Sequence, residues 1–589
     1  MISIKKNSIF LLLALLIVLI LGGWNPHARL PLVNDVNRDL VPQSTEKDHL
    51  KAESLLGLRI VDYSQKHTER QYSPPPSTGA VLNINPPRAH SSYLDHDPIY
   101  ISGNSGFSEF PGNGEDQPYL IDGYRIVGDK TIPIEIWNTN VNFQISNCWL
   151  EGGSTGIRLT NVTHGYITTN VVYYNWNFGI SLIVSNNNTL FNNTVYHDDK
   201  EITSNGIDID SSSNNTISRN TVYNRDNGIH LQNSSHNTVF KNIINNTNNG
   251  MLFELSTHNT VSVNIVTTNN IGISISSSCW NNTLSQNNVC YNDYGIEIHG
   301  SNNTLSANTI YRQIYEGIEI KSGSNNTLSA NTISENRRGI EIAGPSSNTT
   351  LSTNAIYYNR WDGIYTLGNY TMIIDNKIYD NKMWGIIIKL SSHNTVANNE
   401  IIDNTDGGIG LEAFNNTIHS NFIQSNTKGI SLDRAYNNTI IVNFINWSTT
   451  GIYIRDSSNN IISCNNIWNS TEYGIQIAKG NSVSQDNIVC WNNFRGNNPT
   501  GTSQGYDDGR YTVFSRNYWD DWTGSGAYAI DGTANNQDES PFVSPIDNSL
   551  NNCPILPLPY PTITPFAGFI TILVALSMIV VLLHQRKRV

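Results

Sequence analysis

The sequence predicts an all-β solenoid, a parallel β-helix whose coils take about 22 residues each. Two observations lead to this: a glycine-marked repeat, and two columns of asparagine that keep step with it. The repeat is a Gly followed by Ile, once by Met. It occurs at Gly156, Gly179, Gly206, Gly228, Gly250, Gly272, Gly295, Gly317, Gly339, Gly363, Gly385, Gly408, Gly429, Gly451 and Gly474. Intervals of 21 to 24 residues separate them, except for one of 27 between Gly179 and Gly206. A fixed period of this length is typical of solenoids.

Each period contains three short β-type runs separated by turns. The period that begins at Asn302 reads Thr-Leu-Ser, then Asn-Thr-Ile, then Gly-Ile-Glu-Ile. In the last run the aliphatic residues alternate with a polar one, so that they point to opposite faces of a strand. Strands this short and this far apart suit a coil in which each strand pairs in parallel with its equivalent on the next coil.

Two columns of asparagine support the coil. The first is Asn188, Asn215, Asn237, Asn259, Asn282, Asn303, Asn326, Thr349, Tyr370, Asn394, Asn416, Asn438, Asn460 and Asn481. The second is Asn220, Asn242, Asn264, Asn287, Asn308, Asn331, Asn354, Asn376, Asn399, Asn421, Asn443 and Asn465. Asn tolerates the left-handed backbone of a tight corner. Stacked one per coil, its amides can also hydrogen-bond along the column.

These Asn-Asn-Thr and Gly-Ile-x-Ile coils resemble the parallel β-helix repeats of the NosD-like and pectin-lyase-like superfamily over about residues 140–490. The segments before and after the coils are similar to those in archaeal surface-anchored members. The resemblance implies a right-handed helix. It implies function only loosely, because the superfamily includes lyases, hydrolases, binding modules and adhesins.

The ends of the chain predict export and anchoring. Lys5 and Lys6 precede an apolar run typical of a signal segment, and an apolar run at 566–583 precedes a basic tail. The expected segments are a signal peptide or signal anchor (1–28), a largely irregular spacer (29–97), an N-terminal cap with the first coils (98–150), the repeats (151–490), a C-terminal cap (491–547), a Pro-rich stalk (548–565), a transmembrane helix (566–583) and a cytoplasmic tail (584–589). The coils would then lie outside the cell, held by the C-terminal span.

The net charge disfavours one class of partner, and the cysteine spacing favours disulfides over a metal or redox site. A net charge of −13 disfavours nucleic acid. The six cysteines show no Cys-x-x-Cys spacing, which favours disulfides in an exported chain, with their pairing open. The sequence leaves the oligomeric state open.

One candidate site is a column of acidic residues. The outward middle residue of Gly-Ile-x-Ile runs Arg158, Ser181, Asp208, His230, Leu252, Ser274, Glu297, Glu319, Glu341, Tyr365 and Ile387. Like charges opposite one another on neighbouring strands are destabilising. The three glutamates therefore predict either a calcium ion or neutralisation by Lys321, Arg337 and Arg338. No cofactor other than calcium is expected.

Three further clusters were considered. The 27-residue interval brings Asp198, Asp199, Asp208 and Asp210 into one region, where a carboxylate pair could be catalytic. Aromatic residues gather on two or three coils, and Trp361, Tyr365 and Trp384 are the candidates for stacking on sugars. His236 and His258 occupy one turn on adjacent coils, where substitution for Asn is favoured over a metal site.

The function that the sequence favours is a non-catalytic cell-surface module that binds a glycan or another envelope component, or that serves a structural or adhesive role. The first alternative is a polysaccharide lyase or glycoside hydrolase that uses the carboxylates between 197 and 210. The second is an extracytoplasmic copper-handling accessory protein of the NosD type, for which soft ligands would be needed.

Overall fold

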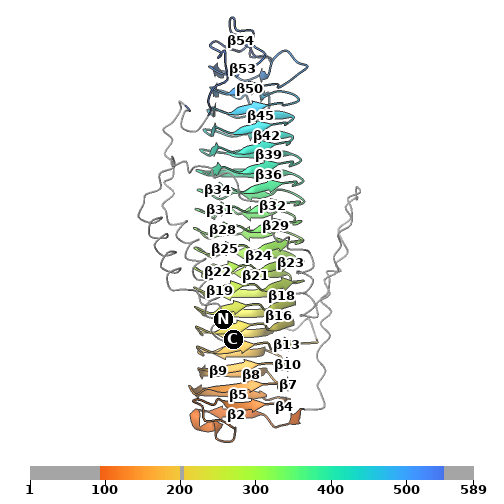
Figure 1. Cartoon of the computed structure of the whole chain (residues 1–589), viewed down its shortest axis with the longest axis vertical. Helices are drawn as coiled ribbons and strands as arrows, with labels where there is room; N and C mark the ends of the chain where they lie inside the picture. Colours follow the sequence, from red (N-terminus) through yellow and green to blue (C-terminus); the bar gives the residue numbers. More distant parts are fainter. Residues whose placement is uncertain (1–92, 199–203, 549–552, 554–589) are drawn as a thin grey trace, which may run out of the picture. The chain divides into compact units, whose positions relative to one another are not determined.

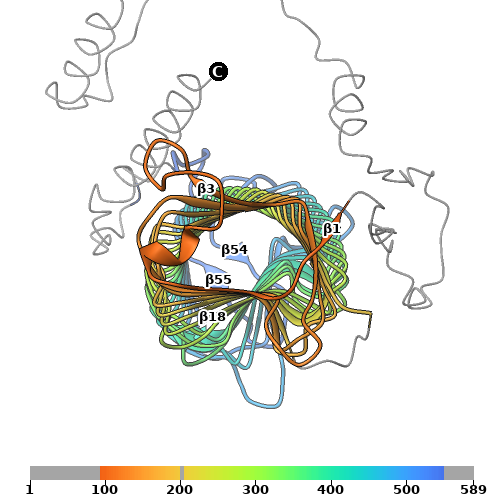
Figure 2. The same cartoon turned by 90° about the horizontal axis from the view of Figure 1, so that it is seen from below.

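The computed structural model describes residues 93–198, 204–548 and 553, all within one compact unit, 75–589. The predicted signal segment, most of the spacer, the transmembrane helix and the basic tail lie outside the described residues. Among the residues described, no helix is both long and apolar enough to cross a bilayer. The described part is a stack of parallel coils, as Figure 1 shows from the side, and the coils superimpose when viewed along the axis (Figure 2).

Most coils contribute three strands, as the sequence predicts, and on two coils the second and third strands are continuous, as β16 (Thr221–Gln232) and β18 (Ile243–Glu254). In one three-stranded coil the strands are β25 (Thr304–Ser306), β26 (Thr309–Tyr311) and β27 (Ile318–Ile320). Each pairs in parallel, in register, with its equivalents on the coils before and after. In the described part of 140–490 there is no α-helix. The prediction of an all-β parallel coil is confirmed.

The core lies inside the coil. Leu305, Ile310, Ile318 and Ile320, one or two from each strand of that coil, are fully buried. Their equivalents on the other coils form one continuous apolar column. Because each inward side chain sits above a similar one, the core is a set of aliphatic stacks rather than a globular centre.

The two asparagine columns are hydrogen-bonded ladders. The backbone N–H and the Nδ2 of Asn308 both donate to Oδ1 of Asn331 on the next coil, at 3.0 and 2.9 Å, and Nδ2 also donates to the carbonyl of Leu284 at 3.0 Å. One amide thus satisfies donors and acceptors on three coils. Such pairing is what buried polar groups require.

Three details of the predicted columns are wrong. The left-handed backbone belongs to the residue before the stacked amide, such as Asn302 (φ 56°) before Asn303. Two positions are also displaced, because Thr371 and not Tyr370 donates its N–H to Asn394, and Asn487 and not Asn481 accepts from Asn460. The exposed corner residue absorbs the turn, which leaves the buried one free for the ladder.

A third ladder, which the sequence did not predict, lies before the Gly-Ile strands. Its members are Asn269, Asn292, Gln313, Asn336, Asn359, Asn381, Asn404 and Asn426. It lies three residues before the glycine on some coils and four on others, which hides the column from a fixed-offset comparison.

The C-terminal end is closed by aromatic side chains and by a returning segment. Trp519 is stacked between Phe494 and Tyr528, with ring centroids 4.2 and 4.3 Å away. The chain then runs back along the coils, and Cys553 forms a disulfide with Cys464. The other four cysteines are buried and unpaired.

Candidate functional site

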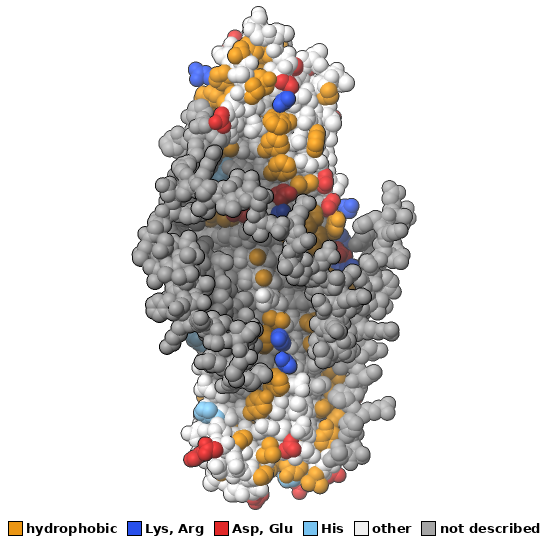
Figure 3. Space-filling view, in the orientation of Figure 1, with side chains coloured by type: hydrophobic (Ala, Val, Ile, Leu, Met, Phe, Trp, Pro, Cys, Tyr) orange, Lys and Arg blue, Asp and Glu red, His pale blue; other side chains and the backbone are white. Residues whose placement is uncertain are grey.

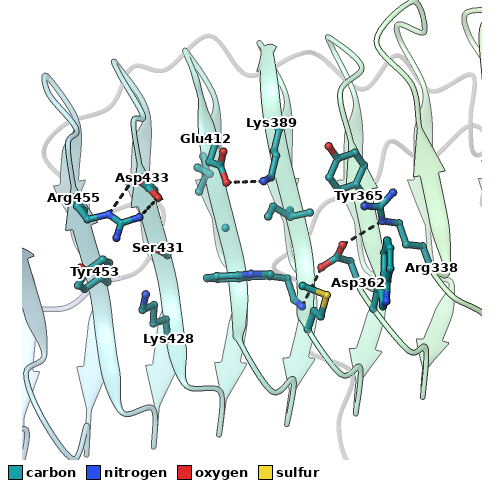
Figure 4. Close-up of a pocket in the computed structure, with 16 residues that line it drawn as sticks. Arg338, Asp362, Tyr365, Lys389, Glu412, Lys428, Ser431, Asp433, Tyr453 and Arg455 are labelled. Carbon is teal, nitrogen blue, oxygen red and sulfur yellow. Dashed lines mark hydrogen bonds and ion pairs between the residues drawn. The ribbon is translucent and has the colours of Figure 1, made fainter. Parts of the chain in front are cut away.

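A trough of about 380 Å³ lies on the outer face of the Gly-Ile-x-Ile strands. It crosses β33 (Ile364–Thr366), β36 (Trp384–Ser392), β39 (Gly407–Phe414), β42 (Lys428–Asp433) and β45 (Thr450–Arg455). Figure 4 shows these strands side by side, with the lining side chains on the near face.

The depth of the trough comes from the outward middle residue of each strand. In register these residues are Tyr365, Ile387, Gly410, Ser431 and Tyr453. The two tyrosines mark the ends, and Gly410 and Ser431 leave the space between them unfilled. The series considered from the sequence stops at Ile387; continuing it by three coils would have shown this fall in side-chain size.

Trp384 forms the apolar wall of the trough. A Cβ added at Gly407 would meet the Cζ3 atom of its indole at 2.2 Å, and one at Gly410 would meet Cε3 at 3.1 Å. The indole therefore lies over both glycines of the next coil, and any larger residue at Gly407 would displace it. Met383 lines the trough beside it.

Trp361 and Tyr365 are less free to stack on a ligand. The guanidinium carbon of Arg338 lies 4.0 Å from the ring centroid of Tyr365 and 5.1 Å from that of Trp361. Arg337 approaches Trp361 as well, at 4.9 Å. The three predicted aromatic residues all line the trough, but two of them already carry a cation–π contact.

The carboxylates of the trough are held by cations. Asp362 pairs with Arg338 at 3.3 Å. Glu412 pairs with Lys389 at 2.7 Å and Asp433 pairs with Arg455, as Figure 4 shows. Burial raises the pKa of Asp362 above its usual range, although Arg338 and a backbone N–H oppose this.

Lys428 is the exception among the cations. It makes no ion pair with any residue that the structure describes, and its Nζ lies 4.1 Å from the ring centroid of Tyr453. Burial, followed by the charge of Arg455, lowers its pKa. The trough thus holds an ammonium group without an ion pair together with the half-buried indole of Trp384, which is a suitable pair for a ligand with both an apolar face and oxygen atoms.

The predicted acidic column is present. Glu297, Glu319 and Glu341 face one another in register on adjacent strands. Lys321 donates to Glu297 at 2.8 Å, and Arg338 donates to Glu341 at 2.6 Å. Arg337, expected to share in this, pairs instead with Glu316. No group of three or more His, Cys, Asp or Glu among the described residues is arranged to hold a metal ion.

The described carboxylates of the 27-residue interval each have a hydrogen-bond partner of their own. Asp198 accepts from the Tyr173 hydroxyl, while Asp208 is buried on β14 (Asn205–Asp210). Asp210 accepts from its neighbour Ser211, and Asp199 lies outside the described residues.

The sequence analysis did not foresee the partner of Asp208. Nδ1 of His230 lies 2.9 Å from Asp208 and Nε2 lies 3.0 Å from Glu254. Burial disfavours the charged imidazole, but the two carboxylates outweigh it and raise the pKa of His230. This cluster is an internal ion network rather than part of the trough.

His236 and His258 are stacked face to face, with centroids 5.0 Å apart and planes at 2°. Nitrogen lone pairs lie in the plane of an imidazole, so that two rings stacked in this way do not converge on one metal ion. The residues present here do not fit a copper site.

Two family models match the chain. One is described as periplasmic copper-binding protein (NosD) and matches residues 127–252 and 197–372; the other, right handed beta helix region, matches 343–441. A search of the curated proteins finds no match. Together with the fold, these matches make the chain a right-handed parallel β-helix repeat protein of the pectin-lyase-like superfamily.

Solved structures resemble it only distantly. The periplasmic alginate epimerase AlgG is 14% identical over 53% of this chain and 80% of that one, with a TM-score of 0.29. A mannuronic acid specific polysaccharide family 6 lyase from human gut microbiota is 12% identical over 52% and 81%, with a TM-score of 0.36. PfbA, a surface adhesin of Streptococcus pneumoniae, is 14% identical over 56% and 84%, with a TM-score of 0.25. At these identities and TM-scores, the similarity to these structures does not indicate what reaction or ligand this chain has.

Proposed function

We propose that the chain is a non-catalytic, extracytoplasmic protein that binds an extended glycan in the trough between Tyr365 and Tyr453. The observation that carries the proposal is the position of the Trp384 indole, which lies over Gly407 and Gly410 and lines the trough. Indole faces suit the apolar face of a sugar ring. The strands repeat at about 4.8 Å, so a polymer along the rod axis meets a new set of side chains on every coil.

The state of the carboxylates favours binding over turnover. Glycoside hydrolysis uses two carboxyl groups, one to donate a proton and one to act as base or nucleophile. In the trough, Asp362, Glu412 and Asp433 each pair with a cation instead. The NosD model is described as copper-binding. Because no group of three or more His, Cys, Asp or Glu among the described residues is arranged to hold a metal ion, we propose no copper chemistry for this chain.

Two observations support an extracytoplasmic location. The matching NosD model is described as periplasmic. The disulfide between Cys464 and Cys553 is of a kind that persists in oxidising compartments and is rare in the cytosol.

The proposal is tested by measuring the binding of the full-length chain to a panel of neutral and acidic polysaccharides. Trp384→Ala should weaken binding about five- to tenfold, since a stacking contact contributes about 1–1.5 kcal/mol. Gly410→Leu should fill the trough and abolish binding. Trp280→Ala, which removes an indole that is 45% exposed on another coil, is the matched control and should bind normally.

Turnover is followed in the same samples. Equal loss of binding in Trp384→Ala and Trp280→Ala, or no binding to any polysaccharide, would remove the trough as the site. Shortening of a polysaccharide by the wild type would show that the protein is an enzyme.

A further inference from the structure

The returning C-terminal segment follows one file of residues on the coil surface. Ile546 exchanges two hydrogen bonds with the side chain of Asn493: its N–H donates to Oδ1 and its carbonyl accepts from Nδ2, both at 2.8 Å. Further on, Cys553 is bonded to Cys464. The segment therefore passes the coils in reverse order, back toward the middle of the stack.

The file beneath it consists of the first residue of successive strands. These are Asn493 in β50 (Asn493–Arg495), Asn466 in β47 (Asn466–Trp468), Phe444 in β44 (Phe444–Asn446) and Phe422 in β41 (Phe422–Gln424). They are paired in register. Nδ2 of Asn548 lies 3.5 Å from Oδ1 of Asn466. The returning segment thus lies over the two asparagines, and the two phenylalanines come next in the same direction.

The phenylalanines form an apolar step in this file. Their rings are stacked with centroids 5.4 Å apart and planes at 4°, and Phe422 is 38% exposed. Trp468 packs edge-on against Phe444 at 4.7 Å. Figure 3 shows that apolar side chains form such vertical files on the face in view.

The residues of the file change from asparagine to phenylalanine at the point where the returning segment becomes proline-rich in sequence. Ile546 binds through its backbone N–H, and an asparagine amide is its partner. The residues after Cys553 read Pro-Ile-Leu-Pro-Leu-Pro-Tyr-Pro, from 554 to 561. Proline has no N–H to donate, so this stretch cannot repeat the amide pairing. Proline-rich segments are bound instead by aromatic surfaces.

We propose that residues 554–561 dock on Phe444 and Phe422 and so continue the file that the returning segment occupies. The reach is sufficient, because two strand spacings are about 10 Å and three or four residues of polyproline II conformation span that distance. The disulfide at Cys464 holds the start of the stretch one coil from Phe444 and gives it a high local concentration.

Photo-crosslinking in the full-length, oxidised protein tests the proposal. Leu558 is replaced by p-benzoylphenylalanine, and the crosslinked peptides are mapped by mass spectrometry. Crosslinks should fall within residues 400–446. The double variant Phe444→Ser/Phe422→Ser should reduce them at least fivefold. Tyr436→Ser, which removes an aromatic side chain that is 43% exposed on another corner of the same coils, should leave the yield unchanged.

Three results would overturn it. Crosslinks spread evenly over the coils would show that no site is preferred. An equal yield in the double variant would show that the phenylalanines do not bind the stretch. Crosslinked dimers on a denaturing gel would assign the file to a second copy of the chain. Wild-type circular dichroism in the double variant confirms that a loss of crosslinks is local.

Discussion

Glu319 should make the protein less stable as the pH rises from about 5 to 8. The Oε2 atom of Glu319 is buried and has no hydrogen-bond partner. The Nζ atom of Lys321 lies 3.7 Å from this oxygen and only 2.8 Å from Glu297, which it binds more closely. Burial raises the pKa of Glu319 to about 7; Lys321 opposes this, and the neighbouring carboxylates Glu316, Glu341 and Glu297 add to it.

The sign follows from proton linkage. The folded state holds a proton on Glu319 up to about pH 7, whereas in the unfolded chain the group has the ordinary glutamate pKa of 4.5. Between these values the folded state binds more protons, so the free energy of unfolding falls as the pH rises. A difference of this size corresponds to about 3–4 kcal/mol. Glu319→Gln should remove this loss and leave the variant more stable than the wild type at pH 8 by that amount.

Glu297→Gln, on the preceding coil, is the matched control, and it should destabilise the protein at pH 8. Burial opposes ionisation of Glu297, but hydrogen bonds from Lys321 and His299 prevail and lower its pKa. Its contribution is therefore present above pH 4.5 and is lost as the pH falls through the lower folded-state value. At pH 8 the Gln variant leaves Lys321 without its closest partner and should be less stable than the wild type.

Urea unfolding of the full chain, monitored by tryptophan fluorescence at pH 5.5 and pH 8, measures both variants. If Glu319→Gln has the same pH dependence as the wild type, or is less stable at pH 8, the account of the column given above is wrong. Adding calcium and then a chelator tests the cation that the sequence predicts here. A calcium-dependent rise in stability that Glu319→Gln abolishes would show that the column binds the ion.

Two further predictions concern the coil itself. Cys553→Ser should lower the free energy of unfolding of the C-terminal coils by about 2–4 kcal/mol, because the disulfide closes a loop with a sequence separation of 89. Hydrogen exchange of residues 464–548 measures this loss. Dithiothreitol should cause the same loss in the wild type and no change in the variant. Ile340→Asp should cost about 4 kcal/mol or more, since it places a charge in a fully buried position, whereas Ile340→Val should cost about 1 kcal/mol; a tolerated Asp in thermal unfolding would contradict the inward assignment.

The sequence predicts the coil well because every coil repeats the same physical requirements. An aliphatic residue at Ile318 must pack against its equivalent at Ile340. An amide at Asn308 must hydrogen-bond to Asn331. Each of these contacts recurs from coil to coil, so the same residue type appears repeatedly in the sequence. The corner residues are harder to assign. Asn302 and Asn303 are chemically identical, and only the backbone shows which one turns the corner and which one joins the ladder.

The site is only partly visible in the sequence for a related reason. Trp361, Tyr365 and Trp384 stand out as aromatic residues and all line the trough, but its depth depends on the absence of a side chain at Gly410. Lys428 could be recognised as unpaired only after the neighbouring cations were matched with carboxylates on adjacent coils. Pairing across coils depends on rotamers that periodicity does not specify.

The same logic explains how the coil tolerates its one long interval. On the coil that follows this interval, Arg225 lies three residues before Gly228, at the position that an amide of the third ladder occupies on later coils. Its guanidinium donates to the carbonyls of Asn175 and Tyr196, at 2.7 and 2.9 Å, and to the Ser204 hydroxyl at 3.2 Å. Burial lowers its pKa to about 9. A guanidinium has five N–H donors, so Arg225 can serve three acceptors where a ladder amide has two N–H groups. The two main asparagine ladders run across the long interval without a break, because Asn188 donates to Asn215 and Asn193 donates to Asn220.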